Sequence, residues 1–270
     1  MQKSSSANNL SSLNTGTIIN ISLGWLMVLV LVLGWWTISN NISDLVMPGP
    51  MMVANSLYEF FSDPILLNDI FISTSRVIGS VIVSVFLGLA LAIIPIHFPV
   101  ADIIVHERVK PFLNSFPSVG WAILAVIWFG SSNFSVMFVQ VAILTPFCLV
   151  NIAEGFRELD KEIIEMARSF TRNGFRIFFK ITLPMLKPVM IPAIVLGTVW
   201  TFNNINVIWL VSNGGEPSNQ THILVSYVYK AAFNLYRYGY AAALSMIIFL
   251  ILLGFVVFFL KKTKATEGVY

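Results

Sequence analysis

The chain has 270 residues, 57% of them hydrophobic and only 11% charged, whereas soluble proteins average roughly 45–50% and 25%. Its mean hydropathy of +0.82 is too high for the apolar side chains to be hidden inside one globule. Lipid must therefore cover much of the surface, which excludes a soluble enzyme and a disordered chain. The single cysteine, Cys148, excludes an intramolecular disulfide and a cysteine-based metal cage. The net charge is only +3, so the position of the charges matters more than their sum.

Six apolar stretches are candidates for membrane-spanning helices, because a helix needs about 20 apolar residues to cross a hydrocarbon core roughly 30 Å thick. In chain order they cover residues 18–38, 70–96, 115–129, 134–152, 188–211 and 240–260. The third reaches span length only when Ser115 to Ser118 are counted with it. The composition and these stretches predict an all-α integral membrane protein with a leader at 1–17, a six-helix domain at 18–260 and a basic tail at 261–270.

The loop charges predict the orientation, since Lys and Arg accumulate in short cytoplasmic loops. The segment 39–69, after the first span, has four acidic residues and no basic one. Basic residues follow the second, fourth and sixth spans: Arg108 and Lys110; Arg157, Lys161, Arg168, Arg172, Arg176, Lys180 and Lys187; and Lys261, Lys262 and Lys264. We therefore expect a multi-pass protein of the inner or plasma membrane with both termini cytoplasmic. No small-residue cleavage site follows Trp36, which favours an uncleaved first span over a signal peptide.

The loop between the fourth and fifth spans, residues 154–185, is longer than a connection needs. Its apolar residues recur at a spacing of three or four, which predicts a surface helix with one apolar stripe: Leu159, Ile163, Met166 and Phe170. Asn173-Gly174 indicates a turn, and residues 175–180 are aromatic and basic. The pattern predicts a helix, a turn and a second helix at the membrane surface that ends at Pro184.

This loop resembles the EAA loop of permease subunits of binding-protein-dependent ABC importers. Glu165 and Ala167 match the E-A-A start, Met166 replaces the first alanine, and Ile181, Leu183 and Pro184 match the distal I-x-L-P. The chain departs from the family at Thr171, where a glycine is usual. The resemblance implies the type I importer permease fold and a loop that docks on an ATPase. The coupling residues implied are Asp160, Glu165, Met166, Ala167, Arg168, Thr171, Leu183 and Pro184.

The resemblance also implies partners. The sequence has no G-x-x-x-x-G-K-[ST] phosphate loop, so ATP and magnesium are expected on separate ATPase subunits, and this chain is expected to be a transport subunit without a cofactor of its own, not an enzyme. A second permease, identical or homologous, and an external solute-binding protein are the other expected partners, besides the lipid bilayer; no nucleic acid is expected. The external segment 212–238 is a candidate for docking that binding protein, plugging the outer mouth or capping the bundle.

Two parts of the chain resemble permeases for different solutes. Met47-Pro48-Gly49-Pro50 and Ser75-Arg76-Val77 are similar to permeases for nitrate, sulfonates and taurine. From Thr201 onward, Phe202-Asn203-Asn204, Gly214-Gly215 and residues 239–243 look like carbohydrate permeases. A sugar or polyol is the preferred cargo, and an oxyanion or sulfonate is the alternative.

The solute path is expected where polar groups enter a span, because such groups are costly in lipid unless they face a cavity or another helix. The candidates are Trp200, Thr201, Asn203, Asn204 and Asn206 in the fifth span and Gln140 in the fourth. Amides and flat aromatic faces suit a hydroxylated solute, although the same residues also bond helices together. Arg76 is a candidate for attracting an oxyanion or, alternatively, for a snorkelling or helix-end role. The three histidines lack metal-ligand spacing.

Two other classes of membrane protein remain as alternatives. An ion- or proton-coupled secondary transporter would place ionisable groups inside its spans, and these spans hold almost none. A membrane-embedded enzyme would need a catalytic constellation, and the sequence shows no paired carboxylates or nucleophile–base pair within reach.

Overall fold

The computed structural model describes residues 5–44, 46–98, 100–212, 215 and 221–263. Within these ranges all regular structure is helical. The first half of the chain forms α1 (Ser5–Ser39), α2 (Pro50–Ser62), α3 (Pro64–His97), α4 (Val100–Asp102), the π-helix η1 (Ile103–Val109), α5 (Lys110–Ser115) and α6 (Ser118–Phe129). The second half forms α7 (Asn133–Glu158), α8 (Lys161–Phe170), α9 (Gly174–Ile177), η2 (Phe178–Thr182), α10 (Leu183–Phe202), α11 (Ile205–Ser212), α12 (Leu224–Tyr229), η3 (Lys230–Asn234) and α13 (Tyr238–Thr263).

Among the described residues, five continuous helical segments are long and apolar enough to cross a membrane: Ser22–Ser39, Pro64–Ile96, Asn133–Glu158, Gly174–Phe202 and Tyr238–Lys261. A sixth span results if the bent pair Val100–Ser115 and Ser118–Phe129 counts as one. The predicted all-helical membrane fold is confirmed. The leader and tail predictions fall partly on residues 1–4 and 264–270, which lie outside the described residues.

The third predicted span differs from the structure because the chain bends by 85° between α5 and α6. Phe116 is extended, as expected for a residue before proline, and Pro117 is the N-cap of α6. The stretch 115–129 is therefore not one straight helix. At its far end, Gly130 has φ +65°, and the hydroxyl of Ser132 accepts a hydrogen bond from the Ser135 N–H at 3.2 Å, which begins α7.

The fifth predicted span also needs correction: the helix starts earlier than residue 188 and ends before residue 211. It continues from α9 through η2 into α10, past Pro184, where the surface helix was expected to stop. The reason is a widened π-turn, in which the Leu183 N–H donates to the carbonyl of Phe178, five residues back. This turn accommodates a proline that would clash in a regular α-helix. The helix then breaks at Asn203, and α11 follows as a separate piece.

The core lies where α3 crosses α7, the most extensive helix pair of the described fold. Gly88 permits this crossing: a Cβ there would lie 2.7 Å from Cys148 Cβ and 2.9 Å from the main-chain nitrogen of Leu149. Ser80 and Ser84 are fully buried on the same helix, and their hydroxyls donate to carbonyls one turn earlier. Both hydroxyls are thereby satisfied inside the bundle.

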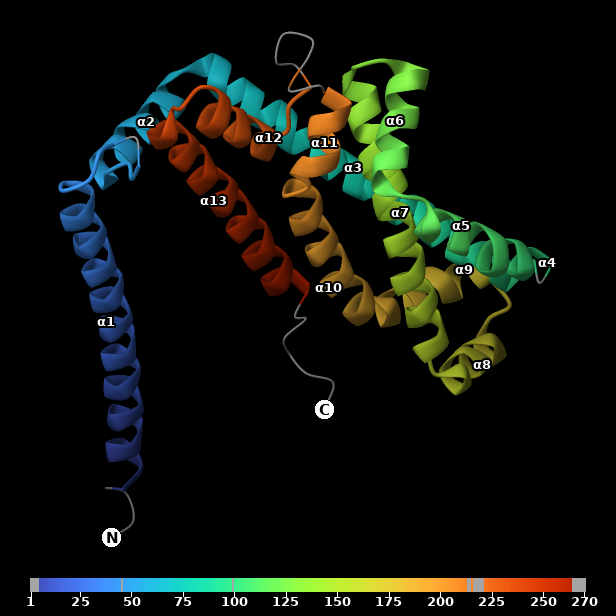
Figure 1. Ribbon diagram of the computed structural model, residues 1–270. Helices are drawn as coiled ribbons and strands as arrows, with labels where there is room; N and C mark the ends of the chain where they lie inside the picture. The colour runs from blue at the N-terminus through green and yellow to red at the C-terminus, as the bar shows by residue number, and fades with distance from the viewer. Residues whose placement is uncertain (1–4, 45, 99, 213–214, 216–220, 264–270) are drawn as a thin grey trace.

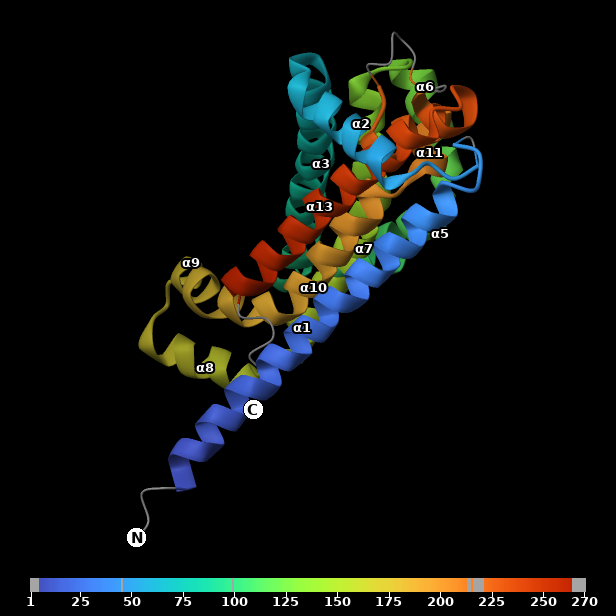
Figure 2. The same cartoon turned by 90° about the vertical axis from the view of Figure 1, so that its left-hand side faces the viewer.

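The helices define two ends of the molecule. The start of α1, the end of α13 and α8 lie toward one end, whereas α2, α11, α12 and the turn between α6 and α7 lie toward the other (Figures 1 and 2). The span of α1 packs little against the rest, and most of its described side chains are exposed. The sequence did not predict α2, which begins at Pro50 inside the acidic segment.

Candidate functional site

The predicted surface helix is α8, and local capping defines both of its ends. Asp160 is the N-cap, and its Oδ1 accepts a hydrogen bond from the Glu162 N–H at 2.9 Å. Thr171 ends the helix in an extended conformation with φ −153°. The Thr171 hydroxyl accepts a hydrogen bond from the Asn173 N–H at 3.2 Å, and Asn173 Oδ1 caps α9. Because this position does not have positive φ, threonine fits where the family usually has glycine.

The apolar residues of α8 occupy two faces, which corrects the prediction of one stripe. Ala167 is only 3% exposed, and Ile164 packs against the core. Met166 and Phe170, one turn apart, are 56% and 83% exposed. Leu159 is buried, but it lies before the N-cap and is not part of the helix. One apolar face of α8 therefore anchors it to the bundle, while the other is uncovered in this chain.

The remaining predicted coupling residues lie on α8 and at the start of α10. Glu165 and Arg168 are exposed on α8. Leu183 packs against the core, while Pro184 is exposed in the first turn of α10. Since α8 contacts α9 and η2, which continue into α10, the loop is joined directly to a membrane-spanning helix.

The predicted path residues do not gather at one place. Trp200 is 51% exposed and lines a cavity. The three asparagines lie near the break after α10, where Asn203 and Asn206 are exposed and Asn204 is half-buried. Thr201 is buried, and its hydroxyl donates to the carbonyl of Gly197 at 2.7 Å. Gln140 is 2% exposed, and its amide has no hydrogen-bond partner among the described residues. Neither of these two buried residues lines the cavity at Trp200.

This cavity has a volume of about 600 Å³ and lies between the α5–α6 bend, α7 and α10. Its lining contains no ionisable group. Apolar residues form part of its walls. The rest is aromatic, with Phe116, Trp121, Phe147 and Trp200, or neutral and polar, with Asn114, Ser115, Ser118 and Asn151. Trp121 Nε1 is buried and has no hydrogen-bond partner in the described part of the chain. Sequence reasoning identified only Trp200 of these residues; the available signs of the others were Pro117 at the bend and Pro146 inside α7.

Arg76 lies at the other end of the molecule, where it joins three segments. Its guanidinium donates from Nη1 to the carbonyl of His222 and from Nη2 to Asn133 Oδ1, each at 2.7 Å. The side chain is 5% exposed, so the proposed snorkelling role is wrong. It also lines a cavity of about 470 Å³ that is separate from the cavity at Trp200.

Comparison with solved structures shows which fold this is. A chain from the crystal structure of a bacterial ABC transporter involved in the import of the acidic polysaccharide alginate matches with a TM-score of 0.65 and 13% identity, covering 94% of both chains. At this identity the likeness shows the fold alone. The helices around the capped α8 are thus arranged as in an ABC importer.

The family follows from the sequence comparisons. The model of the binding-protein-dependent transport system inner membrane component matches residues 104–263, and the chain belongs to this family. A probable ABC transporter permease of Brucella suis is 35% identical over 129 residues, 48% of this chain and 44% of the relative. The trehalose/maltose permease MalF of Thermococcus litoralis is 30% identical over 185 residues, 64% and 61% of the two chains. The diacetylchitobiose permease DasB of Streptomyces coelicolor is 29% identical over 55% and 46%. The chain therefore spans about half the length of the curated relatives it matches.

Proposed function

We propose that this chain is the membrane-spanning permease subunit of an ATP-driven importer, and that α8 docks in a separate ATPase. The uncovered face of Met166 and Phe170 carries the proposal, because an exposed apolar face on a charged helix is suited to a partner surface. Glu165 and Arg168 supply charges beside that face. A second permease subunit would complete the solute path, and an external solute-binding protein would deliver the cargo.

The orientation is part of the same proposal. The end that carries α8 also carries the basic residues of 157–187. The acidic residues of 44–69 lie between the end of α1 and the first turns of α3, at the opposite end (Figure 1). By the positive-inside rule the α8 end faces the cytoplasm. Both chain ends then lie inside, and the opposite end receives the binding protein.

Movement of α8 has a direct route to the solute cavity. The helix follows α7 after Leu159 and contacts η2, which continues into α10. Both α7 and α10 line the cavity at Trp200. Displacement of α8 by a closing ATPase would therefore shift two walls of that cavity as rigid bodies.

A neutral hydroxylated solute, such as a sugar or polyol, fits this cavity best. Its aromatic faces can cover the apolar face of a sugar ring, and its amides and hydroxyls can exchange hydrogen bonds with sugar hydroxyls. An oxyanion is the second candidate because of Arg76, but that residue lines a different cavity and already bonds two protein groups. The names of the two sugar permeases above agree with the first choice.

Co-purification with a P-loop ATPase from the cells that express this chain tests the docking assignment. Replacing Phe170 by aspartate puts a charge in the proposed apolar contact, which should lower the recovered ATPase by about tenfold. Lys261→Asp, a charge change at the same end on α13, is the matched control and should recover the normal amount. Equal recovery with both variants would show that α8 is not the docking element.

A further inference from the structure

A cavity of about 540 Å³ lies behind α8, at the same end of the molecule. Its walls come from the ends of α3 and α7 and from α4, η1 and α8. Part of the lining is apolar, with Pro95, Ile96, Phe156 and Ile164. The rest is charged or titratable, and the proposed solute path does not use it: Asp102, His106, Arg157, Glu165 and Arg168.

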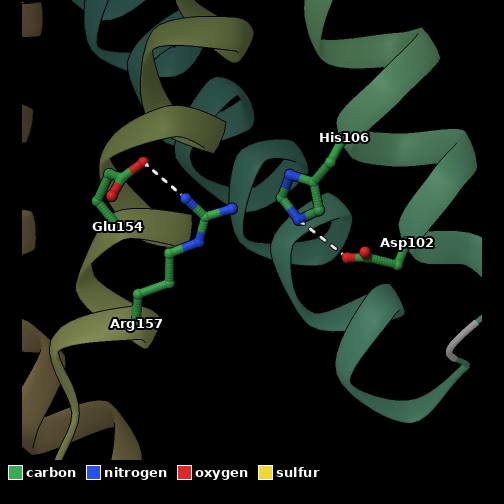
Figure 3. Close-up of polar contacts among 4 residues, drawn as sticks. All are labelled: Asp102, His106, Glu154 and Arg157. Atoms are coloured by element: carbon green, nitrogen blue, oxygen red, sulfur yellow. Dashed lines mark hydrogen bonds and ion pairs between the residues drawn. The ribbon is translucent and has the colours of Figure 1, made fainter.

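Two side-chain pairs face each other across the space between α7 and the segment formed by α4 and η1, and all of their members except Glu154 line the cavity (Figure 3). On one side, His106 Nε2 lies 3.6 Å from Asp102 Oδ1. On the other, Arg157 Nη1 lies 3.4 Å from Glu154 Oε1. The cavity thus presents guanidinium groups and carboxylates from several elements. A simple anion would be repelled by the carboxylates and a simple cation by the arginines, whereas a ligand that carries both charges matches both sets.

The surroundings indicate how such a ligand would be held. The α3 span ends at Ile96, so the cavity lies where a spanning helix leaves the hydrocarbon. Large apolar side chains are exposed along the neighbouring chain: Ile96, Phe98, Val100, Ile103 and Ile104. A molecule with acyl chains could cover these residues while its polar part lay in the cavity.

We propose that this cavity binds the headgroup of a phospholipid that carries a phosphate and a primary ammonium group, as phosphatidylethanolamine does. The phosphate lies against the guanidinium groups of Arg157 and Arg168, and the ammonium donates hydrogen bonds to Asp102 and Glu165. The acyl chains extend over the exposed apolar residues beside α3. The choice of leaflet rests on the proposed orientation, and two residues of the site, Glu165 and Arg168, also lie beside the proposed docking face of α8.

Native mass spectrometry of the full chain in detergent tests this proposal, with phosphatidylethanolamine, phosphatidylcholine and phosphatidylglycerol added singly. The second lipid has the same phosphate but an ammonium without N–H donors, and the third has no ammonium. We expect one retained phosphatidylethanolamine, bound about fivefold more tightly than the other two because only it satisfies both charged sets. Similar retention of all three lipids would overturn the proposal.

Two variants and a control locate the site. Arg157→Gln should weaken phosphatidylethanolamine binding about fivefold, and Asp102→Asn should reduce it to the level of phosphatidylcholine. Arg176→Gln, an exposed arginine on α9 outside the cavity, should leave binding unchanged. If Arg157→Gln behaves like Arg176→Gln, the cavity is not the site. If soluble phosphoethanolamine binds as tightly as the lipid, the ligand is a free phosphate compound and the lipid assignment is wrong.

Discussion

The guanidinium of Arg76 donates a hydrogen bond to the main-chain carbonyl of His222 at 2.7 Å, although the two residues are 146 positions apart. The same group holds Asn133 Oδ1 at the N-terminus of α7. One buried cation therefore joins the second span to the start of the fourth and to the segment before α12. The end of the bundle that lies away from α8 is tied together at this residue.

Replacing Arg76 by methionine should lower the free energy of unfolding by about 3–6 kcal/mol. The variant keeps a long side chain but loses two hydrogen bonds from a charged donor, each worth about 1.5–3 kcal/mol. Unfolding in mixed micelles, followed by tryptophan fluorescence, measures the change. Arg176→Met removes an exposed arginine and should change stability little. Equal stability of the two variants would contradict the joining role of Arg76.

Replacing Gly88 by alanine should destabilise the bundle by about 1–3 kcal/mol, because the added methyl group meets both a side chain and main-chain atoms of α7. Gly254→Ala is the matched control, since its Cβ would have nothing within 4 Å. It should be neutral or stabilising by up to about 1 kcal/mol, from helix propensity alone. Thermal denaturation of both variants in one detergent gives the comparison. A Gly88→Ala protein as stable as Gly254→Ala would show that the crossing of α3 and α7 is looser than the structure has it.

Ala167→Asp and Met166→Asp should produce different defects, since Ala167 is covered by the bundle, whereas Met166, about 100° further around α8, is exposed. A charge at the buried Ala167 should detach the helix from the bundle, so limited trypsin digestion at Arg168 and Arg172 should be about tenfold faster. A charge at the exposed Met166 should leave digestion unchanged but reduce co-purification of the ATPase. Identical digestion patterns for the two variants would contradict the two-faced description of α8.

Trp200→Ala should reduce solute uptake in cells or proteoliposomes by about tenfold, because it removes an aromatic wall of the cavity between α7 and α10. Its half-exposed side chain contributes little to the core, so the amount of folded protein should not change. Thr201→Val removes a hydroxyl that bonds within its own helix and should change uptake by less than about twofold. Uptake that falls more with Thr201→Val than with Trp200→Ala would move the path to the other face of α10.

The amount of structure that the sequence predicts differs between elements. The Asp160 and Asn173 caps place α8 and α9 where the loop sequence predicts a helix, a turn and a second helix, because capping is a local interaction. The course of the chain at Pro184 was not predicted, since the π-turn before it is seen only in the hydrogen bond from Leu183 to Phe178. The bend at Pro117 was likewise missed, because apolar composition is the same for a straight span and for two helices that meet at an angle.

The sequence by itself determined the membrane class, the order of the spans, the charge asymmetry and the position of α8, because hydropathy, loop charge and helix capping are properties of neighbouring residues. Only the tertiary structure decided that Ala167 is covered while Met166 is not, that Arg76 is buried, and that Trp200 meets Asn114 and Asn151 around one cavity. Those relationships depend on which helices cross and how closely, and the crossings bring together residues that are far apart in the chain.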